Sequence, residues 1–125
     1  MTKTKTMKLK IYKIEGKGDL DKEVIWFDVV EDISDLVYYI VSDTTYTDDN
    51  HISNELRHIY WFPSKSVKKG DWIALRTKNG TNSTVKNDRG GNTHTFYWNL
   101  GRTIWNKDGD AAILFKVENW NVVKG

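Results

Sequence analysis

The sequence predicts a single all-β domain that is built as a sandwich or a barrel. Short runs of β-branched and aromatic residues recur along the 125-residue chain, and clusters of Gly, Asn, Asp, Ser and Thr separate them. Helical spacing of apolar residues has little support anywhere in the sequence. The length matches the commonest size of one domain and is enough to bury a sizeable core.

Each strand is predicted from a local pattern. Met7, Leu9 and Ile11 alternate with polar neighbours, which is the period of a half-buried strand. Pro63 ends one run because proline cannot donate to a strand ladder, and Gly70 lies in a turn signal before another run. The predicted strands cover 7–11, 23–30, 36–41, 57–62, 72–77, 93–98 and 111–117, with a further short one at 121–123. The segments 43–56 and 79–92 are predicted to be long polar loops.

Four motifs in the second half of the chain carry a resemblance to a known family. They are Ile-Tyr-Trp-Phe-Pro at 59–63, Val-Lys-Lys-Gly-Asp-Trp-Ile-Ala-Leu at 67–75, Tyr-Trp-Asn-Leu-Gly at 97–101 and Trp-Asn-Lys-Asp-Gly-Asp-Ala-Ala-Ile-Leu at 105–114. In order and spacing, mainly from Ile59 to Leu114, the chain resembles the lamin tail domain family. It departs from that family at 34–38, which lacks a glycine, and at 117–121, which replaces a short final turn.

The resemblance implies an immunoglobulin-like β-sandwich of the Greek-key type with about seven to nine strands. It implies no catalytic residues, since members of the family bind proteins, are fused to nucleases or other enzymes, or are associated with DNA or chromatin. Within this frame we expect a flexible basic leader over 1–6 and a single lamin-tail-like domain over 7–125.

Composition excludes several classes of site. The chain has no cysteine, which rules out disulfides, zinc sites built on thiolates and a cysteine nucleophile. No apolar stretch follows the basic start as a signal peptide requires, and no run approaches the ~20 apolar residues of a membrane span. We therefore expect a cytoplasmic protein with no membrane contact.

Charge is divided into blocks along the chain. The net charge is only +2. Residues 1–17 carry six lysines and one acid, 18–56 carry eleven acids and one lysine, and 57–107 carry ten basic residues and two acids. Such blocks either make a two-signed surface that orients a partner, or lie on neighbouring strands and cancel.

Aromatic residues are the most informative feature of the composition. The chain has six Trp, six Tyr and four Phe, and many are adjacent in the sequence, as in 26–27, 38–39, 60–62 and 96–98. Neighbouring residues of a strand point to opposite faces, so each run places at least one ring away from the core. These outer rings form a binding patch, unless the 43–56 loop covers them or they only stabilise the sheet by cross-strand pairing.

The candidate binding residues are basic and aromatic side chains of the second half. Cations that neutralise phosphates and rings that stack on bases are the ingredients of single-strand nucleic-acid binding. Lysines are also the ordinary solvated face and edge guard of a strand, which is the alternative interpretation. The residues chosen are Trp61, Lys68, Arg76, Arg89, Tyr97, Trp98 and Arg102.

No pattern in the sequence points to catalysis, a metal or a cofactor. Nucleophile elbows, phosphate-cradling loops and zinc-protease helices are absent. His51 beside Asp48 and Asp49 lacks a second ligand group, and Asp108-Gly109-Asp110 reads as a turn rather than a calcium loop.

The expected function is that of a non-catalytic protein-interaction or assembly module, with a protein as its partner. Two alternatives stay open, a nucleic-acid-binding module and, with less support, a glycan-binding module. A homo-oligomer formed through an edge strand is a further expectation.

Overall fold

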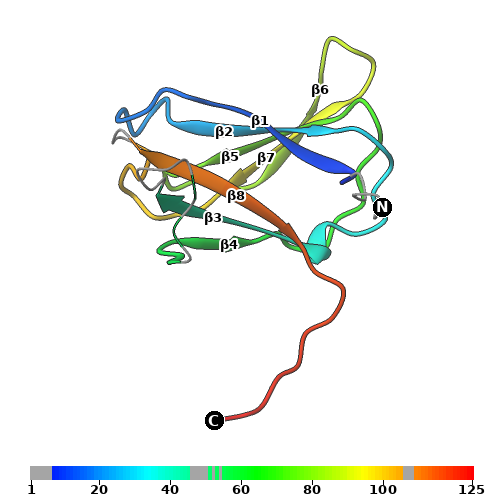
Figure 1. The fold of residues 1–125 in the computed structure, drawn as a ribbon. Helices are drawn as coiled ribbons and strands as arrows, with labels where there is room; N and C mark the ends of the chain where they lie inside the picture. Colours follow the sequence, from blue (N-terminus) through cyan, green and yellow to red (C-terminus); the bar gives the residue numbers. More distant parts are fainter. Residues whose placement is uncertain (1–6, 46–50, 52, 54, 106–108) are drawn as a thin grey trace.

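The computed structural model describes residues 7–45, 51, 53, 55–105 and 109–125. Its strands form two packed sheets, one of five strands and one of three. In Figure 1 the five-stranded sheet is the upper layer, the three-stranded sheet lies below it, and the C-terminal segment runs away from the lower layer. The all-β, sandwich-like prediction is therefore confirmed. The expected leader at 1–6 lies outside the described residues.

The five-stranded sheet has the order β1-β2-β5-β7-β6. Its neighbours pair antiparallel, except that β5 and β7 run parallel. A register shift between Ile11 and Lys13 marks a bulge in β1. The strands are β1 (Leu9–Glu15), β2 (Val24–Val29), β5 (Trp72–Arg76), β6 (Ser83–Lys86) and β7 (Asn92–Tyr97).

The three-stranded sheet has the order β4-β3-β8 and is antiparallel throughout. Its strands are β3 (Tyr39–Thr45), β4 (Ile59–Trp61) and β8 (Asp110–Lys116). Both β4 and β8 lie at an edge of this sheet, and β3 is the central strand.

One hydrophobic cluster fills the space between the sheets. Its middle is aromatic, since Phe62 meets Phe27 and Phe96 edge to face with ring centroids 5.4 and 5.5 Å apart. Tyr60 packs beside them with its ring 5.1 Å from that of Phe62, and burial raises the pKa of Tyr60 to about 12. Each aromatic run therefore delivers at least one ring to the core, and two of the runs deliver two, Tyr60 with Phe62 and Phe96 with Trp98.

A buried carboxylate ties the core to its loops. Glu23 is fully buried and accepts hydrogen bonds from the hydroxyl of Thr77 at 2.7 Å and from the backbone N–H groups of Ile104 and Trp105 at 3.0 and 3.2 Å. A charge without water needs several donors, and this one has them. Glu23 thereby fixes the segment before β8 to the start of β2.

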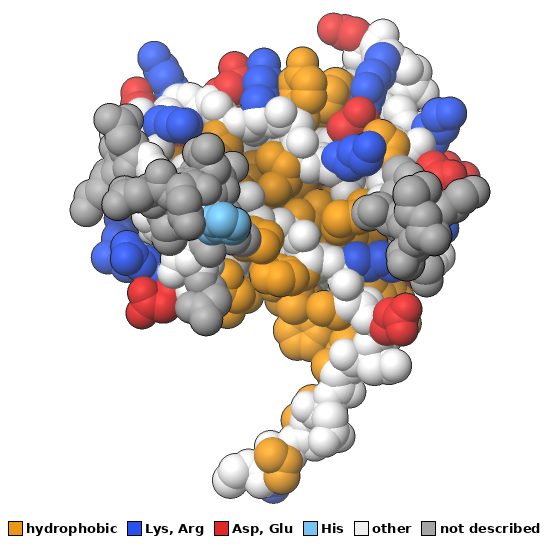
Figure 2. Space-filling view, viewed as in Figure 1, with side chains coloured by type: hydrophobic (Ala, Val, Ile, Leu, Met, Phe, Trp, Pro, Cys, Tyr) orange, Lys and Arg blue, Asp and Glu red, His pale blue; other side chains and the backbone are white. Residues whose placement is uncertain are grey.

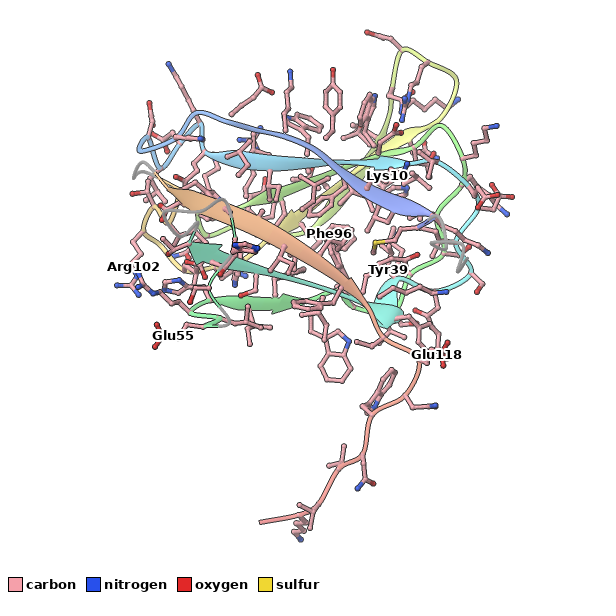
Figure 3. All side chains as sticks on the ribbon, in the orientation of Figure 1. Lys10, Tyr39, Glu55, Phe96, Arg102 and Glu118 are labelled. Atoms are coloured by element: carbon pink, nitrogen blue, oxygen red, sulfur yellow. The ribbon has the colours of Figure 1, made fainter. Side chains whose placement is uncertain are left out.

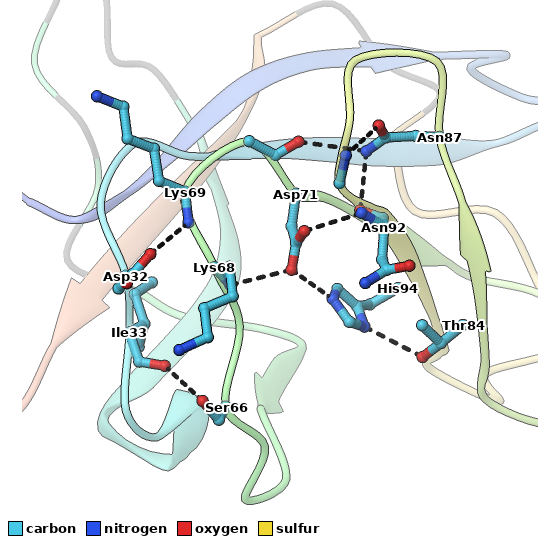
Figure 4. A network of polar contacts seen from close by, with 12 residues as sticks. Asp32, Ile33, Ser66, Lys68, Lys69, Asp71, Thr84, Asn87, Asn92 and His94 are labelled. Atoms are coloured by element: carbon cyan, nitrogen blue, oxygen red, sulfur yellow. Dashed lines mark hydrogen bonds and ion pairs between the residues drawn. The ribbon is translucent and has the colours of Figure 1, made fainter.

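A second polar network holds the β6–β7 hairpin to the turn before β5 (Figure 4). The buried carboxylate of Asp71 accepts from the backbone N–H groups of Lys68 and Asn92 at 3.0 and 2.8 Å and lies 2.8 Å from Nε2 of His94. The other ring nitrogen of His94 lies 3.1 Å from the hydroxyl of Thr84 on the edge strand β6. Burial alone would raise the pKa of Asp71, but these hydrogen bonds outweigh it and lower the pKa below its usual range.

Three strand predictions need correction. Residues 36–38 form a 3-10 turn rather than a strand, because the side chain of Asp35 caps it by accepting from the backbone N–H of Val37 at 3.0 Å. The loop predicted at 79–92 contains β6, whose four residues are all exposed and are held by pairing with β7. The segment 121–123 is not a strand and pairs with no described residue.

The topology bears on two further predictions. An immunoglobulin sandwich is built from two antiparallel sheets, whereas the β5–β7 pair here is parallel. The acidic block supplies β2, which lies between β1 and β5 from the basic blocks, with Lys10 opposite Asp28. In the five-stranded sheet, therefore, the acidic and basic blocks of the sequence lie on neighbouring strands, which is the second of the two alternatives. Among the described residues, no helix is long and apolar enough to cross a membrane.

Candidate functional site

The outer face of the three-stranded sheet carries apolar side chains on both edge strands and at Ile40, around Ser42 and Thr44 of β3, which are buried. The register pairs Ile40 with Trp61 on one side and with Phe115 on the other, and pairs Ser42 with Ile59 and Ile113. Residues opposite each other share a face, so these side chains form one surface, here called the apolar face. Ile59 and Trp61 are 55% and 46% exposed.

An aromatic trio closes one end of the apolar face. The ring of Trp120 lies 5.1 Å from that of Trp61, edge to face, and 5.7 Å from that of Tyr38. The indole N–H of Trp61 donates to the carbonyl of Val37 at 2.6 Å, which fixes its orientation. Trp120 nevertheless stays 47% exposed, so the trio is a partly open aromatic surface.

Beyond Trp120 the chain extends away from the sandwich. This C-terminal tail, residues 121–125, carries Val122 and Val123, which are 79% and 88% exposed. Figure 2 shows hydrophobic side chains gathered over the middle of the molecule and continuing down to the root of the segment that projects from it. Together with Trp120, the two valines leave an apolar segment that is open to a partner surface.

A polar cluster lies at one end of the same sheet on its core-facing side, because Asp43 alternates with Ser42 along β3. The ring Nδ1 of His58 lies 2.9 Å from the carboxylate of Asp43, whose other oxygen accepts from the His58 backbone N–H at 2.6 Å. The guanidinium of Arg102 donates to Nε2 of His58 at 3.0 Å. The hydroxyl of Ser42 donates to backbone carbonyls, among them that of His58 at 2.9 Å. It is therefore not hydrogen-bonded to the imidazole ring of His58, as the serine of a catalytic triad would be. The cluster is a polar rim that fixes Arg102 in place.

The structure does not bring the seven predicted residues into one site. Trp61 lies on the apolar face, and Arg102 lies in the polar rim. Trp98 packs against the core, with its ring 5.7 Å from Tyr60 and 6.3 Å from Trp105. The remaining members lie on the five-stranded sheet and its turns: Lys68, Arg76, Arg89 and Tyr97.

Arg89 is the member that differs most from its predicted role. Its guanidinium lies 3.7 Å from the ring centroid of Trp72 and donates to Asp28 at 2.7 Å. It also donates to the carbonyls of Gly70 and Asp71 at 2.8 and 2.9 Å. Because Nε and one terminal nitrogen of its guanidinium donate inside the molecule, Arg89 acts as a structural clamp between the β6–β7 hairpin and β5.

Two groups of surface side chains are missing from the candidate binding residues that the sequence predicts. Val122 and Val123 belong to the strand predicted at 121–123, although no polar alternation accompanies them, and Trp120 belongs to the segment 117–121 that replaces a final turn. Tyr12 and Trp26 lie on the outer face of the five-stranded sheet near Trp72, and only the pairing of β1, β2 and β5 brings them together. The position of Trp26 could have been predicted from the sequence, because it is adjacent to the core residue Phe27 and therefore points to the opposite face.

No group of three metal-ligating side chains is present among the residues that the structure describes. Asp48, Asp49 and Asp108, named with the two metal possibilities, lie outside that part of the chain. Comparison with known proteins finds no matching family model, no similar curated protein and no similar solved structure.

Proposed function

We propose that the chain is a non-catalytic assembly module that pairs with a second copy of itself. The observation that carries the proposal is the coexistence of an exposed apolar sheet face and an exposed apolar tail in one chain. The tail of each copy lies on the apolar face of the other, with Val122 and Val123 against Ile59 and Trp61.

The tail suits a second copy better than its own molecule. Trp120 already rests against Tyr38 and Trp61 at the end of its own apolar face, and the chain then leaves that face. Residues 121–125, fully extended, reach roughly 17 Å, which is enough to cross the three strands of a neighbouring sheet. Reciprocal exchange gives a closed two-fold dimer, the commonest symmetric assembly.

Burial supplies the free energy for this pairing. Each large aliphatic side chain moved out of water contributes about 2 kcal/mol. Two valines and two face residues from each copy therefore offset much of the entropy lost on association. The edge strands β4 and β8 also offer backbone groups to an added strand.

We also propose that the two packed sheets have the immunoglobulin-like architecture of a lamin tail domain. The motifs over Ile59 to Leu114 and the two packed sheets support it, while the parallel β5–β7 pair departs from the immunoglobulin pattern. The nucleic-acid alternative has less support. Arg89 and Arg102 are engaged within the molecule, and Lys68 lies in a separate turn.

Analytical ultracentrifugation tests the proposal. The full chain is expected to sediment as a dimer, and a chain that ends at Glu118 as a monomer. The Trp61→Ser variant is expected to weaken the dimer, whereas Val85→Ser, which removes an apolar side chain 60% exposed on β6 of the other sheet, leaves it intact. Circular dichroism checks that each variant is folded. A full chain that stays monomeric over a wide concentration range contradicts the proposal.

A further inference from the structure

The outer face of the five-stranded sheet carries an aromatic groove, independent of the apolar face. Tyr12 of β1, Trp26 of β2 and Trp72 of β5 meet there, with ring centroids 5.0 Å apart for Tyr12 and Trp72 and 6.4 Å for Trp26 and Trp72. In Figure 3 ring-bearing side chains project from the upper surface of this sheet. They border a depression of about 230 Å³ that Lys13, Glu15 and Thr93 complete.

A second depression continues the first. It measures about 350 Å³ and shares Glu15 and Trp26 with its neighbour. Its other side is lined by Asp21, Lys22 and Arg76. The two depressions therefore form one groove across β1, β2 and β5, aromatic at one end and charged at the other.

The groove is preorganised by side chains that do not themselves face a ligand. Arg89 covers one face of Trp72 and is tied to Asp28, so Trp72 is held in a single orientation. The face that remains for a ligand is supplied by Tyr12, which is 58% exposed, and by Trp26. Rigid rings at the floor of a groove lose little entropy when a ligand binds.

Two charged side chains that line the groove have unused capacity. The side chain of Arg76 makes no hydrogen bond or ion pair within the part of the chain that the structure describes. Among the described residues, the Glu15 carboxylate pairs with Lys13 at 3.5 Å, and its remaining lone pairs can accept from donors of a ligand.

We propose that this groove binds an oligosaccharide in which one sugar carries a carboxylate. The apolar faces of sugar rings stack on Tyr12 and Trp26, and the carboxylate pairs with Arg76 in the bidentate geometry that a guanidinium favours. Sugar hydroxyls donate to Glu15 and Asp21. Glu15 and Asp21 need hydrogen-bond donors, which sugar hydroxyls supply and a phosphodiester backbone does not, and this favours a saccharide over a nucleic acid.

Calorimetric titration of the full chain tests the groove. The probes are oligouronates of galacturonate, mannuronate and guluronate, a neutral galactose oligomer of the same length, and a single-stranded oligonucleotide. At least one oligouronate is expected to bind about tenfold more tightly than the neutral oligomer. Arg76→Gln should remove that preference, and Tyr12→Ala should weaken both sugars by about tenfold.

Matched controls keep the outcome specific. Arg57→Gln and Tyr38→Ala remove an exposed arginine and an exposed tyrosine away from the groove, and both should bind sugars like the unchanged protein. The proposal is overturned if no oligouronate binds, if Arg76→Gln leaves the preference unchanged, or if the oligonucleotide binds more tightly than every sugar. Tyr38 contacts Trp120 at the root of the tail, so the oligomeric state of Tyr38→Ala is also checked by ultracentrifugation. Tyr12 and Arg76 lie on the other sheet, so the dimer test is read separately from the changes in the groove.

Discussion

Asp71 lies in a predicted turn, and its side chain connects two elements of the fold. Its carboxylate receives two backbone N–H groups and the ring of His94, although only 2% of the residue is exposed. These contacts join the turn before β5 to the start of β7. Removing the charge therefore weakens two elements at once.

The lowered pKa of Asp71 predicts how stability depends on pH. The carboxylate has a lower pKa when folded than its unfolded value of about 3.9, so it stabilises the fold above that value and stops doing so as the pH falls through the folded pKa. Asp71→Asn should lower the free energy of unfolding by about 2 kcal/mol at pH 7. The gap between the two proteins should shrink below about pH 4.

Urea unfolding at neutral and acid pH measures this gap. Asp88→Asn, an exposed acid in the neighbouring hairpin, serves as the control and should change little at either pH. A gap of constant size from neutral to acid conditions would contradict the role assigned to the charge.

At the scale of the element, the β6–β7 hairpin depends on a close approach at Gly91. A Cβ atom there would lie 2.7 Å from both the Asp71 carboxylate and the carbonyl oxygen of Gly70. Because the Gly70 atom is backbone, Gly91→Ala must push the hairpin away, and we expect a loss of about 2 kcal/mol or more. The adjacent Gly90→Ala meets no atom within 4 Å and costs only the strain of its positive φ of 85°, about 1 kcal/mol.

Thermal unfolding compares the stability of the two glycine variants. Equal losses for both variants would show that the backbone conformation, rather than the contact, limits this hairpin.

The elements also show which parts of the fold are readable from the sequence. Strong alternation or dense β-branched and aromatic content predicted β1, β2, β5, β7 and β8, because half-buried strands need that pattern. The pattern fails for β6, since Ser83–Lys86 is exposed throughout and its conformation comes from its neighbour. It fails at 36–38 because an Asp35 cap competes locally with the apolar run.

The site was less predictable than the fold for a related reason. The alternation placed Trp26 and Trp61 outside the core, but it does not say which strands are neighbours. Tyr12 and Trp72 are far apart in the sequence and meet only through β2. Arg89 was singled out as a contact residue, and its partners on β2 and the β5 turn lie too far along the chain to be inferred.

At the scale of the whole molecule, the two proposed surfaces lie on opposite sheets. The apolar face belongs to β4-β3-β8, whereas the aromatic groove crosses β1, β2 and β5. A dimer built on the lower layer of Figure 1 therefore leaves the groove of each copy open on the upper layer. Pairing would then present two grooves on one particle, and a long ligand that spans both gains avidity.

Exchange of the tails also predicts the thermal behaviour of the molecule. A partner that binds only the folded state stabilises it by mass action, so the melting temperature of a dimer rises with protein concentration. We expect this rise for the full chain and none for the chain that ends at Glu118, because removal of 119–125 takes away Trp120 and both exposed valines. Val85→Ser should keep the rise, since its side chain lies on the other sheet. Scanning calorimetry at several protein concentrations measures the melting temperature, and a value that does not change with concentration in the full chain would contradict the exchange of tails.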